Sequence, residues 1–171
     1  MASIVLRKFS YRFAEQVLNS KLALKKECEE ILTDPSLSLS ELSRPSFNAE
    51  LVKRFVSAGW ESQPAVFSDP DQPMARMDFL KDRVGVEVEF GHSSFIGIDV
   101  LKFQIGSYSE LDKIDVGIYV VSTNNFQKRM TSEFGQNWKG GSLSFEKVCR
   151  YLPYFKSAIQ VPIYVIGLDL V

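Results

Sequence analysis

The chain has 171 residues, a formal net charge of −1 and 45% hydrophobic residues. This composition indicates one globular domain with a single core, and the near-zero charge disfavours a protein that coats nucleic acid nonspecifically. A specific DNA-binding site is not excluded, because only the charge around the site matters for it. No run approaches the roughly 18 apolar residues of a membrane span, and the N-terminal segment, with basic residues inside a short apolar run, is unlike a signal peptide.

The two cysteines, Cys28 and Cys149, lie far apart in segments of helical pattern, and neither belongs to a CxxC pair. We expect two free, buried thiols. This cysteine usage indicates the reducing cytoplasm as the compartment.

The first part of the chain is expected to be helical. Apolar residues recur at helical spacing over 8–32, with charged residues between them. A loop rich in Ser, Pro and Leu follows over 33–46. A second helix is predicted from Asn48, a good N-cap residue, to Gly59 at its C-terminal end. We therefore expect one domain, 1–171, with an N-terminal helical part at about 1–46 and a core at about 47–171.

The core alternates strands and helices. After a predicted strand at 60–67 and a hairpin at about 75–90, the pattern indicates a helix at 94–109 and a β-branched strand at 114–122, IDVGIYVVS. A short helix near 125–131, a polar loop over 131–142, a helix at 144–157 and a strand at 161–170 complete the chain. This order predicts a three-layer α/β domain with a central mixed sheet flanked by helices.

The hairpin at about 75–90 contains the candidate catalytic residues. In MDFLKDRVGVEVEFG, residues 77–91, a strand carrying Asp78 is followed by a turn at Lys81-Asp82 and a strand carrying Glu87 and Glu89. Residues two apart on a strand share a face, so three carboxylates are expected to converge on an apolar sheet. Their repulsion and desolvation would be relieved by Mg²⁺, which prefers oxygen ligands. The pattern favours a metal-dependent phosphodiester hydrolase, whereas the alternative is an ordinary acidic hairpin on a solvated face.

The order of elements, together with the segments RMDFLKDRVGVEVEF, IDVGIYVVS and KGGSLSFEKVCRYLPYFKSAIQVPIYVIGLDL, resembles the PD-(D/E)XK nuclease core. Within that superfamily it is similar to the type II restriction endonucleases of the BglII/BamHI-like branch. The resemblance covers most of residues 45–171. It implies a type II restriction endonuclease that hydrolyses double-stranded DNA at a short palindromic site and leaves 5′-phosphates.

The resemblance implies roles for the hairpin residues. Asp78 and Glu87 would bind Mg²⁺, for which Mn²⁺ is expected to substitute, and Val88 would offer its backbone carbonyl. Glu89 stands where most of the superfamily has Lys, so this carboxylate must act as a base or as a ligand of a second metal. The sequence leaves both roles open.

Four further residues are candidates for accessory roles near the metal. Asn48 and Glu50 fit the acidic or amide position that the family places on the preceding helix, although simple helix capping explains them equally well. His92, the one histidine, could approach a phosphate or could end the strand as a polar residue. Lys102 on the following helix could face the site or extend to solvent.

DNA recognition is expected from two polar loops, because Asn and Gln suit adenine and Lys suits guanine or phosphate. Ordinary surface loops contain the same residue types. The resemblance places recognition elements in this region, and a GATC-centred site is a guess from the family alone. The candidate DNA-binding residues are Asn124, Asn125, Gln136, Asn137, Lys139, Ser142 and Ser144.

A palindromic double-strand cut needs two active sites related by a twofold axis, which implies a homodimer. The long first helix and the helix at 94–109 are candidates for its interface. A DNA methyltransferase acting on the same site is the expected partner, and no membrane association is expected. The alternatives are a nuclease of the same core that reads DNA structure in repair or junction resolution, and a noncatalytic α/β binding module.

Overall fold

The structure is a computed structural model, and it describes residues 2–66, 76–108, 112–138 and 142–171. Six strands form one sheet in the order β1-β6-β5-β4-β3-β2. β4, β5 and β6 run parallel, whereas β1 and the β2–β3 pair are antiparallel to their neighbours. The strands are β1 (Ile4–Tyr11), β2 (Glu61–Ser62), β3 (Phe79–Lys81), β4 (Val84–Val88), β5 (Val116–Ser122) and β6 (Ile163–Leu170).

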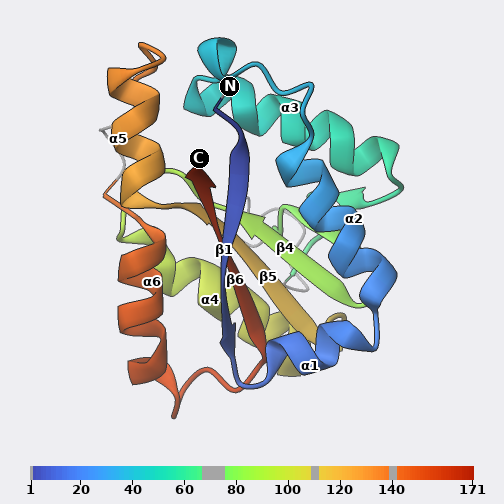
Figure 1. The fold of residues 1–171 in the computed structure, drawn as a ribbon. Coiled ribbons are helices and arrows are strands. Elements are labelled where there is room, and N and C mark those ends of the chain that lie inside the picture. The colour runs from blue at the N-terminus through green and yellow to red at the C-terminus, as the bar shows by residue number, and fades with distance from the viewer. Residues whose placement is uncertain (1, 67–75, 109–111, 139–141) are drawn as a thin grey trace.

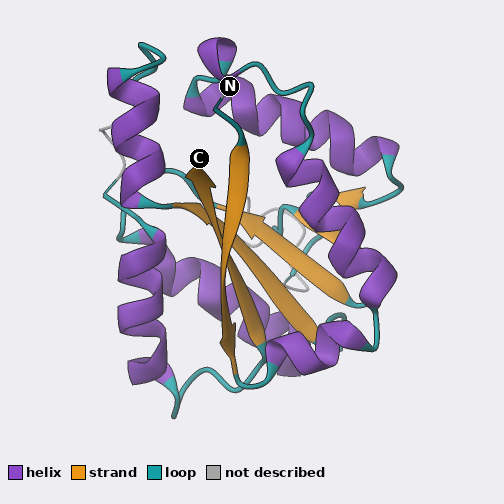
Figure 2. Ribbon diagram, viewed as in Figure 1, coloured by secondary structure: helices purple, strands orange, loops and turns teal. Residues whose placement is uncertain are grey.

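Helices cover both faces of the sheet and give the predicted three-layer α/β architecture (Figures 1 and 2). One apolar core forms where α1, α2, α3 and α5 meet one face, and a second forms where α4 and α6 meet the other. The helices are α1 (Ala14–Asn19), α2 (Leu22–Thr33), α3 (Arg44–Ser57), α4 (Phe95–Tyr108), α5 (Asn124–Ser132) and α6 (Phe145–Tyr151), with 3₁₀ turns at Leu39–Glu41 and Leu152–Phe155. In the described residues, no helix is long and apolar enough to cross a membrane.

The prediction of a helix from residue 8 was wrong, because the chain there begins with a strand. β1 pairs antiparallel with β6 along its whole length, from Ile4 opposite Leu170 to Tyr11 opposite Ile163. Its partner in the sheet is more than 150 residues away in sequence, and this pairing outweighs local spacing. The predicted N-terminal part at 1–46 therefore contributes a strand to the central sheet. Helical structure starts only at Ala14, after positive φ angles at residues 12 and 13.

The helix predicted from Asn48 begins one turn earlier. Ser43 is its N-cap, with a side chain that accepts a hydrogen bond from the Ser46 N–H, and a proline occupies its first turn. Asn48 is therefore inside the helix, and its interpretation as an N-cap was wrong. Gly59, with φ of 84°, follows the C-terminal end as expected.

Most of the other elements were located correctly to within a few residues. Within the described residues 60–66, the predicted strand at 60–67 is reduced to the two residues of β2 and an isolated bridge at Ala65, and residue 67 lies outside the described residues. The helix at 144–157 becomes α6 followed by a 3₁₀ turn. Cys28 is buried and free, and Cys149 is free and half-buried.

The β3–β4 hairpin turns through Asp82 and Arg83, one residue later than predicted. Both residues have positive φ, at 44° and 66°, as a two-residue turn that matches the strand twist requires. The guanidinium of Arg83 binds the carboxylates of Asp112 and Asp115 at 2.7 and 2.8 Å. These contacts hold the turn against the segment that leads into β5, and so they fix β4 beside its parallel neighbour.

The position of α4 depends on a glycine in β5. A Cβ atom placed on Gly117 would lie 2.6 Å from the ring of Phe103, so only glycine lets this aromatic ring lie directly on the sheet. Phe103 is fully buried and follows Lys102 in α4. The close approach therefore sets how near the polar residues of α4 come to β4.

Candidate active site

The acidic residues of the hairpin lie at the ends of β3 and β4, on the face covered by α4. Asp78 directly precedes β3, and the antiparallel register of β3 and β4 places it opposite Glu87. Glu87 pairs in turn with Tyr119 of β5. On the other side, Gln63 donates its side-chain amide to Asp78 Oδ1 at 3.1 Å. Four polar side chains therefore form a row across the sheet.

Glu87 is the most constrained member of this row. It is 3% exposed, and its Oε2 accepts a hydrogen bond from Lys102 Nζ at 3.0 Å. Its other oxygen, Oε1, is buried and has no hydrogen-bond partner in the described residues. Burial and the neighbouring charge of Asp78 raise the pKa of Glu87 to about 9. An unpartnered buried carboxylate oxygen is costly, so this atom is the least satisfied polar group of the row.

Asp78 is held by both of its oxygens. Oδ2 accepts the Val88 backbone N–H at 2.8 Å, and Oδ1 accepts the Gln63 amide. Burial raises the pKa of Asp78, although the hydrogen bond from Val88 and the charge of Lys102 oppose this shift. The carboxylate is therefore orientated by the backbone of the strand that carries Glu87.

Glu89 lies just beyond the end of β4, and its carboxylate folds back to accept the Gly91 N–H. Burial raises its pKa above the ordinary value, against the effect of this hydrogen bond. Glu89 lines a cavity of about 330 Å³ together with Arg44 and Asn48. Of the three hairpin carboxylates, it is the one in this open cavity.

Two residues of α4 complete the charged cluster beneath this row. Lys102 Nζ bridges Glu87 Oε2 and Asp99 Oδ1, at 3.0 and 3.3 Å. Asp99 in turn accepts a hydrogen bond from the Tyr119 hydroxyl at 2.8 Å. Burial raises the pKa of Asp99; burial alone would lower the pKa of Lys102, but the surrounding carboxylates raise it on balance.

The three hairpin carboxylates, which the sequence predicts on one face of the sheet, do not gather into one three-carboxylate metal group. Among the described residues, no group of three or more His, Cys, Asp or Glu side chains could hold a metal ion. The reason is that Glu89 turns toward Gly91, whereas Lys102 fills the space beside Glu87. The smaller set of Asp78, Glu87 and the Val88 carbonyl contains only two carboxylates, and it remains a prediction.

The accessory candidates divide into two groups. Asn48 lines the cavity of about 110 Å³ beside Asp78 as well as the cavity beside Glu89, and Lys102 contacts Glu87 directly. Glu50 lies elsewhere, because its carboxylate pairs with Arg54 at 2.9 Å. It also lies in the second turn of α3, so its interpretation as a first-turn acid was wrong. His92 is exposed, with Nδ1 2.9 Å from Ser94 Oγ.

The candidate DNA-binding residues lie in several environments. Asn124 and Asn125 are exposed in the first turn of α5 rather than in a loop, and Asn137 is exposed. The side chain of Gln136 donates to the Ser40 carbonyl, and Ser142 bonds to Ser93 at the approach to α4. Ser144 is 2% exposed and caps α6, so its hydroxyl is engaged within the protein. Lys139 lies outside the described residues.

Sequence reasoning missed three residues of the site. Asp99 could have been found, since Asp99 and Lys102 are the two charged residues of the otherwise uncharged helix FIGIDVLKFQIGSY and lie on one face. Tyr119 sits inside an apolar run that gives no sign of a polar role. Gln63 follows a two-residue strand and reaches Asp78 only through the sheet pairing.

The fold is similar to that of solved restriction endonucleases. A structure of the restriction endonuclease BglII complexed with a DNA 16-mer superposes with a TM-score of 0.71 at 19% identity, over 95% of this chain and 77% of that chain. Free BglII gives a TM-score of 0.62 at 20% identity, over 95% and 78%. No curated protein sequence matches. The sequence profile of the BglII/BglIII restriction endonucleases matches residues 6–168. The chain therefore belongs to the BglII/BglIII family of restriction endonucleases, which are type II site-specific deoxyribonucleases.

Proposed function

We propose that this restriction endonuclease is Mg²⁺-dependent, cleaves double-stranded DNA at a short palindromic site and leaves 5′-phosphates. The observation that carries the proposal is the buried, unpartnered Oε1 of Glu87, on the strand position opposite Asp78. A divalent cation supplies the missing partner for this oxygen. It also offsets the repulsion between the two carboxylates, which contributes to the raised pKa of Glu87.

The residues present fit such a cation. Asp78 and Glu87 provide oxygen ligands, which Mg²⁺ prefers over nitrogen or sulfur, and the Val88 carbonyl is the third expected ligand. When bound, Mg²⁺ polarises the scissile phosphate and lowers the pKa of water. Asp78 contributes a carboxylate whose direction is already fixed by the Val88 N–H.

Glu89 is assigned the role of general base. Its carboxylate lines the cavity that Asn48 and Arg44 also line, where a DNA phosphate has room to approach. Burial brings its pKa closer to the pH range in which a base both accepts and releases a proton efficiently. The guanidinium of Arg44, which donates to the Phe90 carbonyl at 3.2 Å, provides positive charge at this cavity.

A palindromic site requires a homodimer, and α4 is the proposed interface. The helix carries two charges in 14 residues, and Phe95 and Leu101 are 41% and 48% exposed. A helix that is apolar around most of its circumference is normally covered. Light scattering on the purified protein should therefore give twice the mass of one chain; a monomer at micromolar concentration would contradict this assignment.

The function is tested by incubating the protein with unmethylated phage DNA, with Mg²⁺ and with EDTA. We expect discrete fragments only with Mg²⁺, and fragments that ligate without prior phosphorylation because they carry 5′-phosphates. A continuous smear would indicate a structure-directed or nonspecific nuclease instead. Methylation of the cleaved site should protect the DNA, as expected of an enzyme that is paired with a methyltransferase.

Two matched variants separate catalysis from folding. Glu87→Ala should reduce cleavage by on the order of 10³-fold or more, since it removes a group required in the transition state. Glu27→Ala removes a carboxylate that binds Lys81 at 2.9 Å on the other side of the sheet, and it should leave cleavage near that of the wild type. Equal activity of both variants would contradict the proposed site.

A further inference from the structure

A chain of contacts runs from Tyr119 in β5 to one carboxylate oxygen of Glu87, and it leaves the other oxygen unpartnered in the described residues. The Tyr119 hydroxyl donates to Asp99 Oδ2 at 2.8 Å, Asp99 Oδ1 lies 3.3 Å from Lys102 Nζ, and Lys102 Nζ donates to Glu87 Oε2 at 3.0 Å. Tyr119 is fully buried, Asp99 and Glu87 are 3% exposed, and the Lys102 side chain is 13% exposed. We call these four residues the Tyr119–Glu87 relay.

The relay restrains one oxygen of Glu87 and not the other. Lysine has a flexible four-carbon side chain, so an ammonium on its own fixes a carboxylate poorly. Here Asp99, one helical turn before Lys102, holds the ammonium, and the hydroxyl of a tyrosine packed in the sheet holds Asp99. Each carboxylate oxygen of the relay thus contacts a donor within the relay, except Glu87 Oε1.

A network of buried charges such as this relay is an inefficient way to stabilise the fold. Burying several charges costs more free energy than an apolar cluster of similar volume, and α4 is otherwise uncharged. The cluster also leaves a buried oxygen unsatisfied, which a purely structural network would avoid. A role in orientating Glu87 explains both features.

We propose that Tyr119, Asp99 and Lys102 are positioning residues that hold Glu87 Oε2 and thereby leave Oε1 as the atom that binds the divalent cation. The inference rests on the proposed function only in that the site takes a divalent cation. Tyr119 acts through Asp99 and Lys102, and it need not touch DNA or metal itself. Its removal should therefore weaken metal binding while leaving DNA binding intact.

The test uses the full-length protein, Mn²⁺ as the probe and a matched pair of tyrosine variants. Tyr119→Phe removes the hydroxyl at the start of the relay. Tyr164→Phe is the control, because Tyr164 is also fully buried and lies on the neighbouring strand, but its hydroxyl bonds to Glu29 at 3.3 Å. Mn²⁺ binding is measured by calorimetry without DNA, and stability is measured by thermal unfolding in EDTA.

We expect Tyr119→Phe to weaken Mn²⁺ binding by roughly 10-fold, at the lower end of the effect of removing outer-shell partners of metal ligands. Tyr164→Phe should change the Mn²⁺ dissociation constant by less than about twofold, whatever its effect on unfolding. Asp99→Asn, which keeps an acceptor for Tyr119 but removes the charge that holds Lys102, should weaken binding at least as much as Tyr119→Phe. Equal Mn²⁺ affinity of Tyr119→Phe and wild type would overturn the relay.

Cleavage measured against metal concentration gives a second readout. The Tyr119→Phe enzyme should recover most of its kcat at high Mn²⁺, with an unchanged KM for DNA, whereas a general folding defect would not be rescued by metal. The two proposals fail separately. A wild type that binds Mn²⁺ and responds to Tyr119→Phe but cuts no DNA would keep the relay and reject the proposed function. A wild type that cuts DNA while Tyr119→Phe binds Mn²⁺ normally would keep the proposed function and reject the relay.

Discussion

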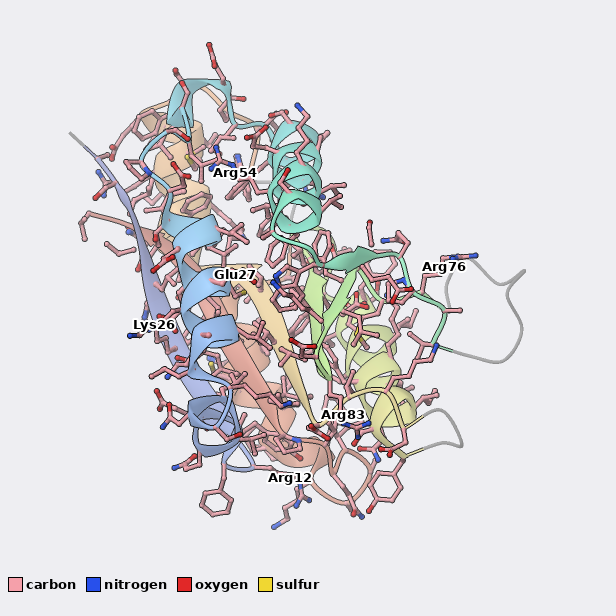
Figure 3. All side chains as sticks on the ribbon, turned by 90° about the vertical axis from the view of Figure 1, so that its right-hand side faces the viewer. Arg12, Lys26, Glu27, Arg54, Arg76 and Arg83 are labelled. Atoms are coloured by element: carbon pink, nitrogen blue, oxygen red, sulfur yellow. The ribbon has the colours of Figure 1, made fainter. Side chains whose placement is uncertain are left out.

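Two groups of charged residues lie on opposite sides of the sheet edge at β3 and β4, and they differ in how completely their charges are paired. The first group, which we call the α2–α3 charge cluster, lies beside these two helices on one side, where Figure 3 labels Glu27 and Arg54. Its members are Glu27, Asp34, Glu50, Arg54 and Lys81. The second group, which we call the active-site cluster, lies under α4 and consists of Asp78, Glu87, Asp99 and Lys102.

In the α2–α3 charge cluster, each carboxylate has a cation. Arg54 binds Asp34 at 2.5 Å and Glu50 at 2.9 Å, and Lys81 binds Glu27 at 2.9 Å. Hydrogen bonds from Ser36 and Arg54 lower the pKa of Asp34. These groups are partly exposed, so their charges are solvated as well as paired.

In the active-site cluster, Lys102 is the cation for three carboxylates. It forms ion pairs with Glu87 and Asp99, and its charge also acts on Asp78. Burial raises the pKa of Asp78, Glu87 and Asp99, and Glu87 keeps an oxygen with no partner in the described residues. The α2–α3 charge cluster nevertheless borders the larger cavity, of about 520 Å³, compared with about 110 Å³ beside Asp78. Incomplete pairing of buried charge, and not cavity size, distinguishes the proposed active site from the α2–α3 charge cluster.

The largest expected difference is in the free energy of unfolding when one glutamate of each cluster is replaced by glutamine, with opposite signs in the two clusters. Because the pKa of Glu87 in the folded protein, about 9, is above its ordinary value of 4.5, the folded protein keeps a proton that the unfolded chain releases. The unfolding free energy of the metal-free protein should therefore fall as pH rises from about 5 to about 9. Glu87→Gln remains neutral, so at about pH 8 it should be more stable than wild type by on the order of 2 kcal/mol.

Glu27→Gln is the counterpart in the α2–α3 charge cluster. It weakens the contacts to Lys81 and to the Trp60 indole N–H, which lies 2.7 Å away, and should cost about 1 kcal/mol across the same pH range. Urea unfolding in EDTA at several pH values measures both variants. The comparison breaks down if Glu87→Gln is destabilised at alkaline pH or follows the same pH slope as wild type.

An intermediate effect is expected from the glycine that lets α4 approach the sheet. Gly117→Ala places a Cβ 2.6 Å from the Phe103 ring, so Phe103 and the adjacent Lys102 must shift, at a cost of about 1–3 kcal/mol. Gly97 lies in α4, and a Cβ added there meets nothing within 4 Å. Gly97→Ala should therefore stabilise the protein by up to about 1 kcal/mol, because alanine favours a helix. Thermal unfolding compares the two, and a Gly117→Ala protein as stable as wild type would show that α4 is not held by this contact.

The smallest effect is expected for Glu50→Gln. The side chain is 32% exposed and its ion pairs with Arg54 and Lys53 lie within α3, so the loss should be below about 0.5 kcal/mol. Cleavage should remain at the wild-type level. A strong loss of cleavage would place Glu50 in the catalytic machinery after all, and would remove the distinction between the two clusters.

The hairpin could be predicted from sequence because its signals are local. Alternation of polar and apolar residues defines β4, and a two-residue turn fixes the register that brings Asp78 opposite Glu87. Helix α4 and strand β5 were located by their own apolar patterns. The family resemblance rested on these same segments, and the match over residues 6–168 confirmed it.

The first strand could not be predicted in the same way. The spacing of Phe9 and Phe13 fits a helix, yet residues 4–11 pair with β6 at the far end of the chain. Such a choice depends on hydrogen bonds that exist only once the sheet has formed. The error in the N-terminal part has this one cause.

The sequence by itself determined that the hairpin carboxylates share a face, since their spacing along two short strands decides the face on which they lie. Only the tertiary structure decided how each is held. Lys102 and Asp99 reach Glu87 because Phe103 packs on Gly117, and Tyr119 joins them through the parallel pairing of β4 and β5. Burial and contacts between distant segments set the pKa of each group, and no local pattern contains that information.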